Sequence, residues 1–113
     1  MPLADLSSSE REVVKDCLRA AVEGPFFPDW EFSTLFGLTR GEVKDILESW
    51  PDLDEQDEAV MLAINGSFNN LLGYPHGRRN NRSEFIAVTA EDLLRIYVKW
   101  RGRIIQNYFD GFM

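Results

Sequence analysis

A chain of 113 residues with 44% hydrophobic and 27% charged residues has the size and composition of a single globular domain, residues 1–113. No apolar run approaches the roughly 18 residues that a membrane-spanning helix needs, so we expect neither a membrane protein nor a disordered chain. The N-terminus has no basic leader or apolar segment, and the single Cys17 cannot form an internal disulfide. We therefore expect a cytoplasmic protein.

The formal charge of −7 is unevenly distributed along the chain. Residues 1–72 contain five Lys and Arg against fifteen Asp and Glu, whereas residues 73–113 contain seven against four. An acidic body repels nucleic acid and attracts cationic partners, while a local basic excess suits an anion. The charge favours a cationic protein partner, with a solvated surface as the ordinary alternative.

The first predicted helix begins at a capping box. Ser7 and Glu10 have the spacing in which the serine hydroxyl accepts a hydrogen bond from a free backbone amide and the glutamate reaches back to the cap. Apolar residues then recur at three- and four-residue steps until Gly24 and Pro25 stop the helix. Cys17 lies on this apolar stripe, so we interpret it as a buried hydrophobe and not as a nucleophile.

Residues 29–50 predict two short helices joined at a glycine. Asp29 is placed to cap the first helix, Gly37 suits a left-handed turn, and Thr39 opens the second helix in a capping box with Glu42. The apolar faces of both helices also carry the aliphatic residues Leu35, Val43, Ile46 and Leu47. We expect the aromatic residues of the two faces to pack between the first and last long helices: Trp30, Phe32, Phe36 and Trp50.

This segment resembles the helix-turn-helix motif of DNA-binding domains. The small residue, the turn glycine and the apolar residues stand at the expected relative positions, as Ser33, Gly37, Val43 and Ile46. The resemblance implies that residues 40–49 would be a recognition helix in the major groove. Three acidic residues offset the two basic ones there, whereas DNA readers neutralise phosphates with Lys and Arg. We interpret the segment as a core-building hairpin and keep nucleic-acid binding as the alternative.

An acidic run precedes a longer predicted helix that carries apolar residues from Val60 to Leu72 and closes at Gly73. Within this helix, Gly66 predicts a bend or the close approach of another backbone. The carboxylates would lie near the first helical turn, where the helix dipole favours them, or they would form a docking patch for a basic protein. The spacing of a calcium loop is absent, so we expect no metal there. The candidate protein-binding residues are Asp52, Asp54, Glu55, Asp57 and Glu58.

Residues 74–83 form the one segment without apolar periodicity, and they hold the only histidine. Arginine presents a fork of donors that suits phosphate or carboxylate, so nucleic-acid binding through the basic loop Arg78 to Arg82 is one further alternative, and anion or nucleotide binding there is another. No phosphate-loop or dinucleotide motif accompanies the segment, and a solvated loop is the ordinary interpretation. The candidate anion-binding residues are His76, Arg78, Arg79 and Arg82.

The last part of the chain begins with Phe85-Ile86-Ala87-Val88, a run too short to distinguish a buried strand from an apolar plug. Thr89 and Asp92 then form a capping pair for the last long helix, in which we expect Trp100 in the core. The aromatic residues of segment 107–113 either fold back onto the core or contact a second subunit, so a homodimer is one alternative.

No catalytic arrangement is legible in the sequence. One histidine and one cysteine, far apart, indicate neither a zinc site nor a Cys-His pair, so we predict a protein without catalytic residues or cofactors. We predict a mainly α-helical bundle of about five helices that binds another macromolecule. Its size and acidity resemble those of small acidic bacterial proteins. Immunity proteins and antitoxins neutralise or regulate a cationic partner, which makes a protein-binding, regulatory role the predicted function.

Overall fold

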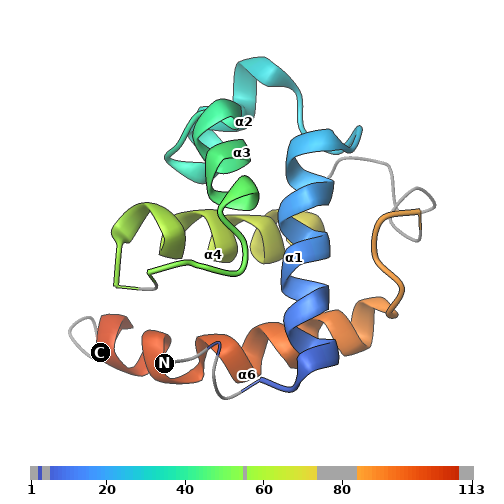
Figure 1. Ribbon diagram of the computed structural model, residues 1–113, viewed down its shortest axis with the longest axis vertical. Coiled ribbons are helices and arrows are strands. Elements are labelled where there is room, and N and C mark those ends of the chain that lie inside the picture. The colour runs from blue at the N-terminus through green and yellow to red at the C-terminus, as the bar shows by residue number, and fades with distance from the viewer. Residues whose placement is uncertain (1–2, 4–5, 55, 74–83, 110–113) are drawn as a thin grey trace.

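The computed structural model describes residues 3, 6–54, 56–73 and 84–109, with side chains described as far as residue 101. This part of the chain contains α-helices and no strand, which confirms the mainly α prediction. In Figure 1, α1 crosses α4 and α6, and the α2–α3 hairpin lies at the C-terminal end of α1. Among the described helices, none combines the length and apolar character that a membrane span requires. The helices are α1 (Ser8–Glu23), α2 (Asp29–Phe36), α3 (Arg40–Glu48), α4 (Glu58–Gly73) and α6 (Ala90–Phe109).

Both predicted capping boxes are present. The Ser7 hydroxyl accepts from the backbone amide of Glu10 at 3.2 Å, and the Glu10 carboxylate accepts from the amide of Ser7 at 2.8 Å. Thr39 and Glu42 make the same reciprocal pair at the start of α3, at 3.2 and 2.9 Å. Each box satisfies amides that the start of a helix leaves unpaired. The starts of α1 and α3 therefore follow from residues three positions apart.

The start of α2 differs from the prediction. Its N-cap residue is Pro28, no side chain caps it, and Asp29 is the first residue of the helix. The Asp29 carboxylate instead accepts a hydrogen bond from Nε of Arg40 at 2.9 Å. The end of α2 is as expected, because Gly37 has a φ of 72° and donates its amide to the Ser33 carbonyl at 2.8 Å.

The α2–α3 hairpin packs against α1 and α4, and α4 in turn packs against α6. The prediction that the hairpin aromatics lie between the first and last long helices is wrong, because α4 separates the hairpin from α6 (Figure 1). Under the hairpin, the rings of Phe32 and Phe36 stack with centroids 4.3 Å apart, and Phe27 meets Phe36 edge-on at 5.4 Å. A second aromatic cluster lies between α4 and α6, where Phe68 stacks on Tyr97 at 5.1 Å.

Trp30 is not part of the core, contrary to the prediction. It is 80% exposed, whereas Phe32 and Phe36 are buried. A helix of eight residues can bury only one face, and residues four positions apart share that face. Phe32 and Phe36 occupy the buried face of α2, so Trp30, two positions before Phe32, points to solvent. Trp50, Leu35, Ile46 and Leu47 are partly buried against the core.

Gly66 makes room for the side-chain ring of Phe36 in α2, whereas the prediction was a bend or the close approach of another backbone. A Cβ atom at position 66 would lie 2.7 Å from Cδ2 of Phe36, closer than real contacts allow. The neighbouring Asn70 is buried, and its side-chain Nδ2 donates to the backbone carbonyls of Leu35 and Gly66, at 3.2 and 2.9 Å. Gly66 and Asn70, both poor helix formers, therefore serve the packing between α2 and α4.

Residues 85–88 form an apolar plug and not a strand. Ile86 is 1% exposed, and the ring of Phe85 meets Phe26 edge-on with centroids 5.8 Å apart. Arg19 of α1 holds this segment by donating to the Phe85 carbonyl at 3.2 Å. The Thr89 hydroxyl then accepts from the amide of Asp92 at 3.1 Å, which confirms the predicted cap of α6.

Tyr97 connects α6 to α4 through polar contacts at the edge of the core. Its hydroxyl donates to Oδ1 of Asn65 at 2.7 Å and accepts from Nη1 of Arg101 at 2.9 Å. Burial raises the pKa of the Tyr97 phenol, so the hydroxyl keeps its proton and remains a donor at neutral pH.

Residues 107–113, on which the homodimer alternative depends, have no described side chains.

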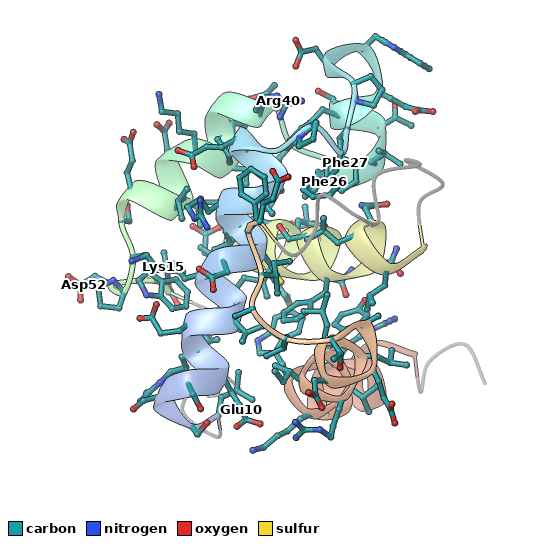
Figure 2. The ribbon with its side chains drawn as sticks, turned by 90° about the vertical axis from the view of Figure 1, so that its right-hand side faces the viewer. Glu10, Lys15, Phe26, Phe27, Arg40 and Asp52 are labelled. Carbon is teal, nitrogen blue, oxygen red and sulfur yellow. The ribbon has the colours of Figure 1, made fainter. Side chains whose placement is uncertain are left out.

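Glu10 joins the N-terminal end of α1 to α6. Its side chain is 13% exposed and lies 2.8 Å from Nζ of Lys99 and 3.8 Å from Nη1 of Arg95. Figure 2 shows Glu10 beside α6 at the lower end of α1. The hydrogen bond from Lys99 and the bond from the Ser7 amide lower the pKa of Glu10 to about 2, from an ordinary value of 4.5.

This lowered pKa predicts a pH-dependent loss of stability. Because the folded-state pKa of Glu10 lies below its unfolded value, its contribution is present above about pH 4.5 and disappears as the pH falls toward 2. We expect Glu10→Gln to destabilise the protein in urea denaturation at pH 7 and to have a much smaller effect at pH 2. Glu12→Gln, on the exposed face of α1, is the control. Equal effects of Glu10→Gln at both pH values would contradict the assignment.

Candidate functional site

A cleft of about 250 Å³ lies between α3 and the start of α4, and we call it the acidic cleft. Its apolar residues form the base, because Val60 is buried and Ile46 and Leu53 are half-buried, whereas its aspartates are exposed. The cleft therefore combines an apolar base with a carboxylate rim. Its lining residues are Asp45, Ile46, Ser49, Asp52, Leu53, Asp54, Asp57 and Val60.

The turn after α3 brings the acidic run beside that helix. Ser49 ends α3 and donates its hydroxyl to the Asp45 carbonyl at 3.1 Å. The amide of Asp52 then donates to the Ser49 carbonyl at 2.8 Å, and the amide of Leu53 donates to the Pro51 carbonyl at 2.9 Å. These short-range bonds reverse the chain, so residues 52–54 lie next to the last turn of α3.

Two of the rim aspartates also hold the backbone that carries them. Oδ1 of Asp54 accepts from the amide of Gln56 at 3.0 Å, and Oδ1 of Asp57 accepts from the amide of Ala59 at 3.0 Å. Each bond engages one oxygen, and an ionised carboxylate has a second oxygen that can accept from a ligand. Asp54 and Asp57 are therefore held in place before any partner arrives, which lowers the ordering cost of binding.

Three of the predicted protein-binding residues, Asp52, Asp54 and Asp57, line the acidic cleft. Glu58 is the first residue of α4, is exposed and does not line the cleft, while Glu55 lies outside the described residues. The sequence reasoning missed Asp45, which α3 contributes to the same rim. Its signal was the pair Asp45 and Ser49, which share one helical face, but only the turn after α3 places that face beside the acidic run.

The predicted anion-binding residues, His76, Arg78, Arg79 and Arg82, lie outside the described residues, so that prediction is not tested. Within residues 6–54, 56–73 and 84–101, no three His, Cys, Asp or Glu side chains group closely enough to hold a metal ion. Cys17 is buried in α1.

Arg40, the first residue of the helix that would read DNA, is engaged inside the protein. Its Nη1 donates to the carbonyls of Ala21 and Val22 at 2.9 and 3.0 Å, and its Nη2 donates to the Phe27 carbonyl at 2.7 Å. With the bond from Nε to Asp29, the guanidinium connects the end of α1, the linker between α1 and α2 (residues 24–28), and α2 itself. It lies 4.6 Å from the centroid of the Phe32 ring. Figure 2 shows Arg40 above Phe27.

Because the Arg40 guanidinium is bonded within the protein, it adds little positive charge to the surface that α3 presents to solvent. Lys44 is exposed, but so are three acidic residues of the same helix, Glu42, Asp45 and Glu48. The accessible surface of α3 is thus net acidic, the opposite of what phosphate contacts require.

Comparisons with known protein families, with curated proteins and with solved structures find no match to this chain.

Proposed function

We propose that this protein binds a partner protein without catalysing a reaction and takes a cationic, amphipathic segment of that partner into the acidic cleft. The observation that carries the proposal is the acidic cleft itself, in which four aspartates surround an apolar base. A Lys or Arg side chain has the matching chemistry, because its aliphatic stem covers apolar surface while its charged end reaches carboxylates. Four carboxylates on one face would also steer a cationic partner toward the cleft.

A domain with a formal charge of −7 that covers a basic segment of another protein would mask it, which is how an immunity protein or antitoxin acts. Nucleic-acid binding is the weaker proposal, because the described structure engages Arg40 internally and leaves α3 net acidic.

A peptide titration tests this proposal. We expect a peptide of alternating lysine and leucine, added to ¹⁵N-labelled protein, to shift the amide signals of residues 45–60. The rim variant replaces the four aspartates of the acidic cleft with asparagine: Asp45→Asn, Asp52→Asn, Asp54→Asn and Asp57→Asn. It should bind the peptide about tenfold or more weakly, because four ion pairs of a few tenths of a kcal/mol each are lost. Asparagine keeps an Oδ1 acceptor at positions 54 and 57, so the hydrogen bonds to the backbone amides of Gln56 and Ala59 are preserved.

A matched variant removes four negative charges outside the cleft. It includes Glu58, which belongs to the acidic run but does not line the cleft, and it should bind the peptide nearly as well as the wild type. Equal weakening in both variants would show that only the total charge matters, and an absence of shifts at residues 45–60 would contradict the site. The control changes are Glu12→Gln, Glu58→Gln, Glu84→Gln and Glu91→Gln, none of which lines either cleft.

A further inference from the structure

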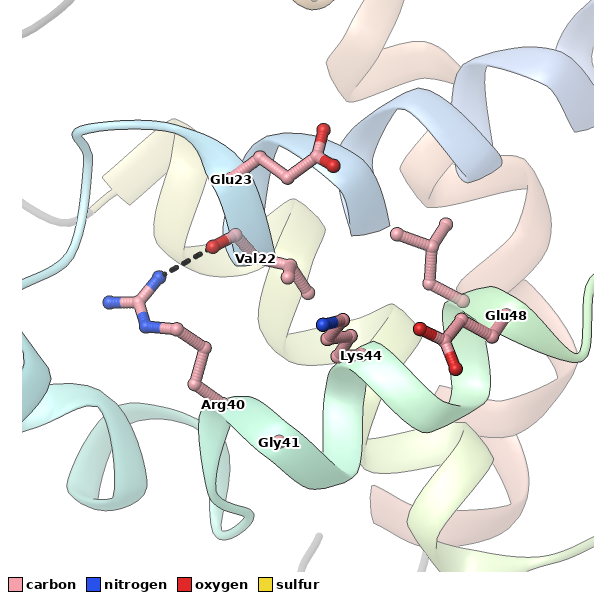
Figure 3. Close-up of a pocket in the computed structure, with 7 residues that line it drawn as sticks. Val22, Glu23, Arg40, Gly41, Lys44 and Glu48 are labelled. Carbon is pink, nitrogen blue, oxygen red and sulfur yellow. Dashed lines mark hydrogen bonds between the residues drawn. The ribbon is translucent and has the colours of Figure 1, made fainter.

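A second cleft lies on the other side of α3, between this helix and the last turn of α1 (Figure 3). We call it the α1–α3 cleft. Its volume of about 460 Å³ is within the range of small-molecule sites, and it shares no residue with the acidic cleft. It is lined by Val22, Glu23, Arg40, Gly41, Lys44, Leu47 and Glu48.

Gly41 has no evident role in the fold, in contrast to Gly37 and Gly66. Its backbone does not have a positive φ, and a Cβ atom there would meet only the Thr39 hydroxyl, at 3.9 Å. Glycine is a poorer helix former than alanine, so helix stability does not account for it in the first turn of α3. The missing side chain keeps the α1–α3 cleft open above the first turn of α3, which is the arrangement expected where a ligand approaches a backbone closely.

The charges around the α1–α3 cleft come from two helices. Glu23 of α1 and Glu48 of α3 are exposed carboxylates, and Lys44 lies between Val22 and Glu48 in Figure 3. Neither Lys44 nor Glu48 forms an ion pair within the described residues, and Glu23 meets only Arg19, at 3.8 Å. The guanidinium of Arg40 is already bonded to three carbonyls and Asp29, so it closes one end of the cleft without serving a ligand.

We propose that the α1–α3 cleft binds a free basic amino acid of the lysine type. Such a molecule carries two ammonium groups and one carboxylate, the complement of two carboxylates and one ammonium in the cleft. Its aliphatic chain would lie on Val22 and Leu47, which are partly buried against the core. Lys44 would pair with the ligand carboxylate, and Glu23 and Glu48 with its ammonium groups. This site is separate from the acidic cleft, so it stands or falls independently of the proposed partner binding.

Three related small molecules separate the contributions of these charges. Lysine has all three charged groups, norleucine lacks the side-chain ammonium, and cadaverine lacks the carboxylate. In titrations of ¹⁵N-labelled protein at constant ionic strength, we expect lysine to shift the amides of residues 22–23 and 40–48 at roughly millimolar concentration. Norleucine and cadaverine should each bind about two- to fivefold more weakly, the value of one exposed ion pair.

Variants of the cleft then assign each charge. Lys44→Met should abolish the preference for lysine over cadaverine, and Glu48→Gln should reduce the preference for lysine over norleucine. Gly41→Leu should fill the cleft and abolish the shifts, whereas Gly41→Ala, the fold control, adds a methyl group where the structure has open space. Equal binding of the three molecules, or lysine-dependent shifts that survive Gly41→Leu, would overturn the proposal, as would no shift at residues 22–23 and 40–48.

Discussion

Replacing Trp100 with alanine should lower the free energy of unfolding by about 4 kcal/mol, whereas the same replacement at Trp30 should change it by less than about 0.5 kcal/mol. Trp100 is 1% exposed and stacks near Phe68 with ring centroids 6.4 Å apart. Its removal would leave a large void between α4 and α6. Trp30 is 80% exposed, so alanine removes little buried surface there and is a better helix former.

Urea denaturation followed by circular dichroism at 222 nm measures both effects without relying on tryptophan fluorescence. The slope of the unfolding free energy against urea concentration should be similar in the wild type and both variants, which would show that the variants differ in stability and not in the extent of unfolding. Comparable losses at the two positions would mean that Trp30 is buried in solution, as the sequence pattern predicts, and would contradict its exposure in the structure.

Replacing Arg40 with methionine should lower the free energy of unfolding by about 2–3 kcal/mol. The Arg40 side chain is only 27% exposed, and its guanidinium makes charge-assisted bonds to the carbonyls of Ala21, Val22 and Phe27. Two of these carbonyls belong to the last turn of α1, which contains no basic residue of its own. Arg40 thus supplies from α3 the positive charge that stabilises the C-terminal end of a helix. Methionine keeps the aliphatic stem and leaves these acceptors unpaired.

Arg40→Lys separates the role of charge from that of geometry. Lysine retains the charge but cannot span two helix carbonyls, the linker and Asp29 at once, so it should recover less than half of the loss. Lys44→Met, one turn further along α3 and exposed, is the matched control and should stay within about 0.5 kcal/mol of the wild type. A similar cost for Arg40→Met and Lys44→Met would show that the observed bonds contribute little in solution.

The Arg40 prediction bears directly on the function of α3. The resemblance to a helix-turn-helix motif placed Arg40 where a DNA reader would contact bases, but in the structure its side chain joins α1, α2 and α3. With Arg40 engaged, the exposed surface of α3 is a ridge with one cleft on either side. The acidic cleft suits a basic segment of a partner, and the α1–α3 cleft suits a small ligand, so each can be tested with the other left intact.

Local features of the sequence determined the starts of α1 and α3 and the end of α2. Ser7 with Glu10, and Thr39 with Glu42, form their capping boxes because both partners lie within one helical turn. Gly37 adopts a positive φ for a reason that also acts within one residue, the absence of a Cβ atom. Interactions of this range depend little on the rest of the chain, so their patterns could be interpreted without a structure.

Tertiary packing alone decided which faces of these helices are buried and which side chains meet. Trp30 and Phe32 are similar in hydrophobicity, yet α4 covers only the face that carries Phe32 and Phe36. Arg40 bonds to carbonyls 13 to 19 positions earlier, and Asp45 joins Asp52 only through the turn after α3. Residue spacing shows which side chains share a helix face but not which helix will cover it. The acidic character of residues 45–58 was therefore legible in the sequence, while the cleft that gives it a proposed use came from the packing of α3 against α4.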